Sequence, residues 1–118
     1  MKINSVTVGI PVPNLEKSIE WYRKLLGDIE SFSPAEGIWE ICVTPSFTLQ
    51  LFELEAEESS MKNIGFESTD IEESHKLVTA LGVTASEIEI VPDTVSYFEF
   101  SDPFGNLLSF YQVLAVNA

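Results

Sequence analysis

The feature that most constrains the fold of this chain is an internal repeat. At an offset of 56 residues, segment 7–10 aligns with 63–66 and segment 14–18 with 70–74; at an offset of 59 residues, 40–41 aligns with 99–100 and 49–51 with 108–110. Similarity at a fixed period indicates that one structural unit is used more than once. The chain is therefore expected to contain two copies of one module.

Each module is predicted to consist of one strand, one helix and three further strands. Asn14 and Asp70 have the side chains expected at helix starts, and Gly27 and Gly82 are expected to end the helices. Between these positions apolar residues recur at helical spacing. Runs rich in β-branched and aromatic residues predict the strands, which are 3–10, 29–33, 38–43 and 47–53 in the first copy and 62–67, 87–91, 95–101 and 106–113 in the second.

Two βαβββ modules predict an α+β fold. Placed side by side, they would form a curved, eight-stranded mixed sheet with both helices on its outer face and an open inner face that serves as a pocket. The length of 118 residues suits one compact domain. We therefore expect a single domain, 1–118, with module one at 1–54, a linker at 55–61 and module two at 62–118.

Strand alternation predicts which side chains line the inner face, because successive side chains point to opposite faces of a sheet. The expected inner-face residues are Ser5, Thr7, Gly9, Thr48, Gln50, Phe52, Asn63, Gly65, Glu67, Leu107, Ser109 and Tyr111. The middle strands stay unassigned, since both faces of 95–100 carry plausible residues. The facing of Glu40 and Glu99, which the repeat relates, is open for the same reason.

The net charge of −13, from 6 basic and 19 acidic residues, restricts the class of partner. Segments 28–61 and 77–118 contain no Lys or Arg and carry the whole excess of acid. Such a surface repels phosphate backbones and anionic lipid headgroups, so neither nucleic acid nor a membrane is expected as a partner. A charged ligand is expected to be cationic.

The hydrophobic runs and the cysteine count bear on the cellular location. No apolar run reaches the roughly 18 residues of a spanning helix, and the segment 1–14 lacks the apolar stretch of a secretory signal, so a cytoplasmic location is expected. The single cysteine, Cys42, cannot form an internal disulfide and is expected to be a small, buried strand residue.

Three segments carry a resemblance to a known family. Val12 to Gly27, VPNLEKSIEWYRKLLG, and the matching segment 63–82 resemble the strand-to-helix segments of the vicinal oxygen chelate superfamily, and Ser101 to Ser109, SDPFGNLLS, resembles its "DPxGNxxE" ending. This superfamily groups glyoxalase I, bleomycin-resistance proteins, metal-dependent fosfomycin-resistance enzymes and extradiol dioxygenases. The chain is closest in character to the metal-free, bleomycin-resistance-like members.

The resemblance also implies where a catalytic metal would be held. Enzymes of this superfamily usually bind a divalent ion with four His or Glu side chains, two from each module. The matching positions here are Thr7, Gln50, Asn63 and Ser109, all neutral. Neutral amides and hydroxyls without a carboxylate bind divalent cations weakly. We therefore expect no metal and no cofactor.

No other catalytic set is evident. The only histidine, His75, falls on the second helix, away from the inner face, where a partly buried structural role is expected. Glu40 and Glu99 are a symmetric carboxylate pair, and at least one is expected at the rim or in solvent. Glu67 and Glu99 are only weak catalytic candidates. Whether the chain is an enzyme stays open, with non-enzymatic function favoured.

The favoured hypothesis is a metal-free protein that binds a small aromatic ligand, neutral or cationic, in the pocket of the curved sheet. The expected ligand-binding residues are Thr7, Gln50, Asn63, Ser109, Phe52, Tyr111 and Trp39, with Tyr97 and Phe98 as further aromatic candidates. Alternatives are a divergent glyoxalase-like lyase, isomerase or oxygenase that uses a metal or a Glu general base, and an interaction module without a small ligand. The family resemblance implies a homodimer.

Overall fold

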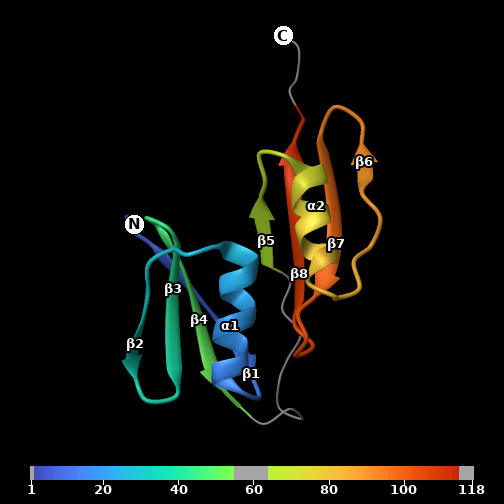
Figure 1. The fold of residues 1–118 in the computed structure, drawn as a ribbon. Coiled ribbons are helices and arrows are strands. Elements are labelled where there is room, and N and C mark those ends of the chain that lie inside the picture. Colours follow the sequence, from blue (N-terminus) through green and yellow to red (C-terminus); the bar gives the residue numbers. More distant parts are fainter. Residues whose placement is uncertain (1, 55–63, 115–118) are drawn as a thin grey trace. The chain divides into compact units, whose positions relative to one another are not determined.

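A computed structural model describes residues 2–54 and 64–114 of the chain. The chain divides into two compact units, Met1–Ser60 and Met61–Ala118, and each holds one βαβββ module (Figure 1). The predicted linker at 55–61 and Asn63 lie outside the described residues. The assignment of 1–118 as a single domain stays a prediction.

Module one has one helix over one mixed sheet. Its elements are β1 (Val6–Val12), α1 (Leu15–Leu26), β2 (Ser31–Ala35), β3 (Ile38–Thr44) and β4 (Phe47–Glu53). The strand order is β1-β4-β3-β2, with β1 parallel to β4 and the other neighbours antiparallel.

Module two repeats this arrangement. Its elements are β5 (Ile64–Glu67), α2 (Ile71–Ala80), β6 (Glu89–Val91), β7 (Val95–Ser101) and β8 (Leu107–Val113). The order β5-β8-β7-β6 has the same pattern of one parallel and two antiparallel pairs. The α+β class and the repeated βαβββ order are confirmed, and the eight strands form two hydrogen-bonded sheets of four.

Both helices begin at the predicted caps. The Asn14 side chain accepts a hydrogen bond from the Lys17 amide at 3.0 Å, and Asp70 accepts one from the Glu73 amide at 3.2 Å. Each cap thereby satisfies one of the backbone donors left free in the first helical turn. Gly27, directly after α1, adopts a φ of 86°, which glycine reaches without steric cost.

Each helix covers one face of its own sheet and forms the core there. In module one, α1 packs on β3 and β4, where Ile41, Leu49 and Leu51 are buried. In module two, α2 packs on β7 and β8, where Phe98 and Leu108 are fully buried. Burial of a large apolar side chain contributes roughly 1.5–3 kcal/mol. The other face of each sheet has no helix, so it is the face available for a site.

Several strand bounds differ from prediction: β1 begins at Val6 rather than residue 3, β6 begins at Glu89 rather than residue 87, and two strands extend past prolines. β1 runs through Pro11 and β2 includes Pro34, whereas the predicted strands ended at residues 10 and 33. β1 and β2 are the two outer strands of their sheet. A proline is tolerated there because an outer strand has one side whose N–H groups make no ladder bonds.

Within the described segments, no helix combines the length and the apolarity needed to cross a membrane.

Candidate functional site

The helix-free face of module one carries the polar residues that strand alternation predicted. Gly9 pairs with Gln50, and Glu40 pairs with Gln50 from the other side. The Gln50 side-chain amide donates a hydrogen bond to the Glu40 carboxylate, with 2.8 Å between Nε2 and Oε2. Glu40 therefore lies on this face rather than on the helix side. The bond also fixes the orientation of the Gln50 amide.

Trp39 does not lie on this face, which corrects its expected place among the ligand-binding residues. It pairs with the buried Leu51, so its side chain shares the helix-covered face. The Arg23 guanidinium of α1 lies 5.6 Å from the centroid of the Trp39 ring, on the same side. The indole thus packs beneath the helix.

The helix-free face of module two is acidic and aromatic. One row across the sheet pairs Glu67 with Tyr111, Tyr111 with Tyr97, and Tyr97 with Glu89. The adjacent row pairs Gly65 with Ser109 and Ser109 with Glu99. Residues directly opposite on neighbouring strands share a face. Glu67, Glu89 and Glu99 therefore lie on one face with two tyrosines, and all three carboxylates are exposed.

The same register settles the facing of β7. Phe98 is fully buried and makes an edge-on ring contact with His75 of α2, with 4.8 Å between ring centroids. Phe98 is therefore a core residue, and its suggested role beside the ligand is wrong. Tyr97 and Glu99 lie on the helix-free face. The sequence alone did not decide between the two faces of this strand.

Tyr97 is oriented by its neighbour on β6. Its hydroxyl donates a hydrogen bond of 2.8 Å to the Glu89 carboxylate. This bond raises the pKa of Tyr97 above its usual value of 10.0, and the negative charges of Glu89 and, more weakly, Glu99 raise it further. The phenol is consequently a neutral donor at physiological pH, and it occupies one acceptor position of Glu89.

In each module an aromatic ring covers a strand glycine on the helix-free face. A Cβ built on Gly9 would lie 3.1 Å from Cε1 of Phe52, and one built on Gly65 would lie 3.4 Å from both Cδ1 and Cε1 of Tyr111. Gly9 and Gly65 are equivalent in the repeat, as are Phe52 and Tyr111. A Cβ at Gly9 would therefore crowd the Phe52 ring, whereas a Cβ at Gly65 would crowd the Ser109 hydroxyl oxygen at 3.2 Å and meet the Tyr111 ring at an ordinary contact distance.

The residues at the family's metal positions do not fit a divalent ion. Thr7 and Gln50 offer only a neutral hydroxyl and a neutral amide, and the Gln50 amide is bonded to Glu40. The Ser109 hydroxyl approaches the Ile64 carbonyl at 3.5 Å, and Asn63 lies outside the described residues. Over 2–54 and 64–114, no group of three or more His, Cys, Asp or Glu side chains is placed to hold a metal.

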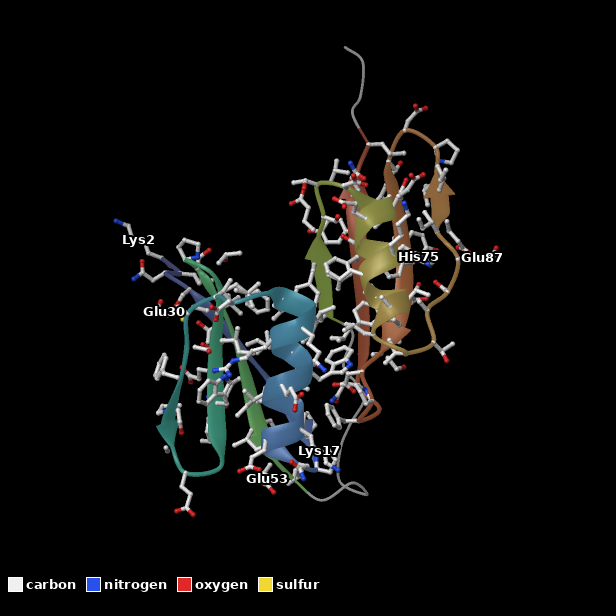
Figure 2. All side chains as sticks on the ribbon, viewed as in Figure 1. Lys2, Lys17, Glu30, Glu53, His75 and Glu87 are labelled. Carbon is white, nitrogen blue, oxygen red and sulfur yellow. The ribbon has the colours of Figure 1, made fainter. Side chains whose placement is uncertain are left out.

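His75 lies on the second helix, and Cys42 lies on the third strand of module one. Figure 2 shows His75 on α2, directed toward the segment that carries Glu87, and its Nε2 lies 2.9 Å from the Ser86 carbonyl oxygen. The expectation that His75 lies away from the helix-free face is confirmed. Cys42 pairs with Thr48 on the helix-free face of module one and is half-buried, more accessible than expected.

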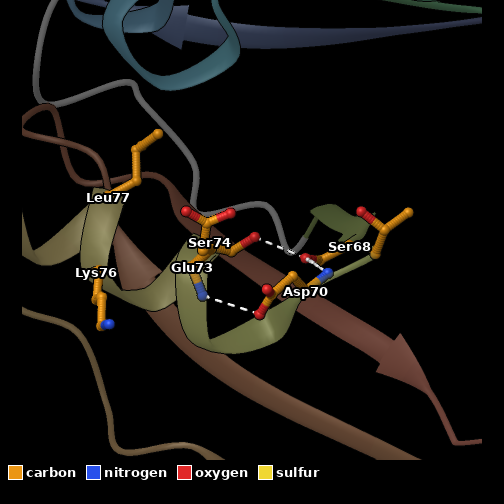
Figure 3. Close-up of a pocket in the computed structure, with 7 residues that line it drawn as sticks. Ser68, Asp70, Glu73, Ser74, Lys76 and Leu77 are labelled. Carbon is orange, nitrogen blue, oxygen red and sulfur yellow. Dashed lines mark hydrogen bonds between the residues drawn. The ribbon is translucent and has the colours of Figure 1, made fainter.

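A hollow of about 600 Å³ lies at the start of α2, and its polar groups already serve the helix cap (Figure 3). The Ser68 hydroxyl accepts a hydrogen bond from the Asp70 amide at 3.0 Å and lies 2.7 Å from the Ser74 hydroxyl. Asp70 in turn accepts from the Glu73 amide. Three of the polar side chains that line the hollow, Ser68, Asp70 and Ser74, therefore already have hydrogen-bond partners at the start of α2.

Two site features escaped prediction from the sequence. The Tyr97–Glu89 hydrogen bond depends on β6–β7 register, which no local pattern shows. The placement of Glu40 beside Gln50 depends on the pairing of β3 with β4. The repeat does show in the sequence that positions 40 and 50 of module one correspond to 99 and 109 of module two.

The repeated βαβββ fold is typical of a family, and a comparison of the sequence with family models identifies it. The model of the Glyoxalase/Bleomycin resistance protein/Dioxygenase superfamily matches residues 2–110. The chain belongs to this superfamily. A comparison with curated protein sequences finds no significant match.

Solved structures share the fold at low sequence identity. A glyoxalase/bleomycin resistance protein from Catenulispora acidiphila is 23% identical, with a TM-score of 0.77, over 93% of this chain and 98% of that one. An integron cassette protein from the mobile metagenome of the Halifax Harbour sewage outfall is 23% identical, with a TM-score of 0.79, over 92% and 97%. A structure named lactoylglutathione lyase, from Agrobacterium tumefaciens, is 16% identical, with a TM-score of 0.74, over 91% of each chain. At these identities the likeness concerns the fold alone.

Proposed function

We propose that the chain is a metal-free small-molecule-binding protein whose ligand is aromatic and either neutral or cationic. The ligand-binding residues in this proposal are Thr7, Gln50 and Phe52 in module one, and Asn63, Ser109 and Tyr111 in module two. Trp39 is left out because it packs under α1. The proposed function involves no cofactor, no nucleic acid and no membrane. We also propose that the chain forms a homodimer, which sedimentation at micromolar concentration tests.

The observation that carries this proposal is the type of polar group on the helix-free faces, where neutral amides and hydroxyls stand at the positions of metal ligands. At the described family metal positions the chain has only neutral donors, and the Gln50 amide is held by Glu40. Directed amide and hydroxyl groups beside Phe52 and Tyr111 suit hydrogen bonding and stacking rather than coordination of an ion. The excess of carboxylates disfavours anionic ligands.

Titration calorimetry against three matched sets of aromatic compounds, cationic, neutral and anionic, tests the proposal. Binding of cationic or neutral members, weakened about tenfold or more in Gln50→Ala because a directed hydrogen bond is lost, is the expected result. Glu16→Gln, an exposed change on the surface of α1, is the control. Preference for the anionic set, or no binding in any set, would contradict the proposal.

A second candidate is a divergent glyoxalase-like lyase, isomerase or oxygenase with a metal or a Glu general base. Its support is the position of Glu40 and Glu99 on the helix-free faces, together with the fold shared with the Agrobacterium structure named lactoylglutathione lyase. Elemental analysis of the purified protein tests the metal form. Turnover that is lost in Glu40→Gln, Glu67→Gln or Glu99→Gln would support the general-base form, and retention of full turnover in all three would contradict it.

A further inference from the structure

β6 is an outer strand of the module two sheet, and β7 is the strand that pairs with it (Figure 1). An outer strand has N–H and C=O groups that point away from the sheet and can pair with another chain. The residues before β6 also lie along β7, since Ala85 bridges to Phe100. The Ser86 amide donates a hydrogen bond to the Glu99 carbonyl at 2.8 Å. The chain thus follows β7 over 85–91, with a one-residue shift of register before β6.

Both ends of this edge are already engaged by the chain itself. Nε2 of His75 on α2 lies 2.9 Å from the Ser86 carbonyl oxygen, so that carbonyl is occupied. At the other end the Thr94 amide donates to the Val91 carbonyl at 3.0 Å, where the chain turns back into β7. The part of the edge that can accept another strand is therefore 87–91, and β6 is its regular part.

The side chains on this edge are apolar and exposed. Ile90 is 67% exposed and Val91 is 43% exposed. Consecutive residues of a strand point to opposite faces, so the edge offers apolar contact on both faces of the sheet. The other outer strand of module two, β5, differs in this respect, because its Ile64 and Phe66 are buried.

The outer strands of module one are protected against pairing, whereas β6 is not. β1 contains Pro11, and β2 contains Pro34 together with a break in register between Phe32 and Ala35. Prolines, bulges and lysines on an outer strand hinder the addition of another strand. β6 itself contains none of these. Its short length disfavours extended aggregation but does not block one added segment.

The charge around β6 determines which kind of strand fits. Glu87, Glu89 and Asp93 are exposed, and none of them forms an ion pair with a described residue. Segment 77–118 contains no Lys or Arg. A second copy of the chain fits badly, because antiparallel pairing centred on Ile90 would bring the like charges of Glu87 and Asp93 together. A strand with basic side chains is complementary to this edge.

We propose that the outer edge of β6, over residues 87–91, is a docking site for an extended basic polypeptide segment with alternating apolar residues. Backbone hydrogen bonds align the segment along the edge, its apolar side chains contact Ile90 or Val91, and its basic side chains lie near Glu87 and Glu89. The inference goes beyond the proposed function and does not rest on it, because none of the proposed ligand-binding residues lies on β6.

Fluorescence anisotropy with a labelled peptide of sequence KVKVKVK, blocked at both ends, tests the site on the full chain. Saturable binding is the expected result. The same peptide with N-methyl groups on its three central residues should bind about tenfold more weakly, because it keeps the charge and loses the backbone donors. The peptide EVEVEVE, which has the same apolar residues and the opposite charge, should not bind.

Two matched pairs of variants locate the peptide. Ile90→Lys is expected to weaken binding by about tenfold, because it removes an apolar contact and repels the lysines of the peptide. Ile3→Lys makes the same change at another exposed isoleucine, 73% exposed, and should bind as wild type. Glu87→Gln should weaken binding by about threefold, whereas Glu16→Gln on α1 should not. All four positions are exposed, so the unfolding midpoint is expected to change little.

Amide hydrogen exchange supplies a local measurement, with slower exchange expected within 87–91 when KVKVKVK is bound. Equal binding of the N-methylated peptide would show attraction by charge alone and would overturn strand addition. Absence of KVKVKVK binding, or unchanged binding in Ile90→Lys, would overturn the site as well. A wild-type dimer that Ile90→Lys dissociates in sedimentation would assign this edge to a second copy of the chain and would also overturn the proposal.

Discussion

A single buried carboxylate organises the turn between β7 and β8. Oδ1 of Asp102 accepts hydrogen bonds from the amides of Phe104 and Asn106, each at 2.9 Å, and Oδ2 accepts one from the Asn106 side chain at 2.8 Å. Asp102 is only 3% exposed, so water does not substitute for these bonds. Since the turn joins two paired strands, it contributes to the register that places Glu99 opposite Ser109.

Replacing this carboxylate is predicted to destabilise the protein. Asp102→Ala is expected to lower the free energy of unfolding by about 2–4 kcal/mol, because it leaves buried donors without their acceptor. Asp102→Asn keeps one acceptor oxygen and is expected to cost about half as much. Urea unfolding followed by circular dichroism measures both. A value for Asp102→Ala within about 0.5 kcal/mol of wild type would contradict this role for the carboxylate.

The sheet face that a side chain occupies could be predicted from the sequence for some residues and not for others. Alternation placed Gln50 and Tyr111 on the helix-free faces from the sequence, because β4 and β8 each have one clearly apolar face. It could not place Trp39 or Glu40, since β3 offers apolar and polar residues on both faces. Pairing with β4 decided both: Trp39 lies opposite the buried Leu51 and packs under the helix, while Glu40 lies opposite Gln50.

At the scale of elements, the two helix caps are equivalent in the repeat and are expected to be equivalent in energy. Asn14→Ala and Asp70→Ala should each reduce stability by about 1 kcal/mol, because each removes the acceptor for an amide in the first helical turn. Asp70→Asn preserves an acceptor oxygen and should be nearly neutral. Amide hydrogen exchange at Lys17 and Glu73 provides the local measurement. Unchanged exchange in the alanine variants would show that the caps contribute little.

The elements themselves were largely predictable, and the reasons for the exceptions are physical. β4 (Phe47–Glu53) and β7 (Val95–Ser101) have the predicted bounds, because alternating apolar residues end at clear turn residues. The end of β1 was predicted two residues too early because a proline normally signals the end of a strand, and the position of β1 at the outer edge of its sheet removes that restriction.

At the scale of the whole molecule, the net charge affects stability, and it is the sum of residues from many elements. The net charge is −13, and within the described segments the one ion pair is Lys24 with Glu20, 3.6 Å apart and exposed. An exposed pair within one helix adds little stability. Repulsion among the remaining carboxylates therefore acts against the compact state.

Salt is consequently predicted to stabilise the folded chain. Raising the ionic strength from about 0.01 M to 0.15 M shortens the screening length from about 30 Å to about 8 Å, so repulsion between distant carboxylates is largely removed. The Tm measured by calorimetry should rise over this range, and sodium chloride and choline chloride should act alike because both screen charge. A Tm that stays constant or falls would mean that the acidic residues lie far enough apart, or close enough to the six basic residues, for their repulsion to be negligible. A rise with sodium alone would instead indicate a bound ion, which would contradict screening as the cause.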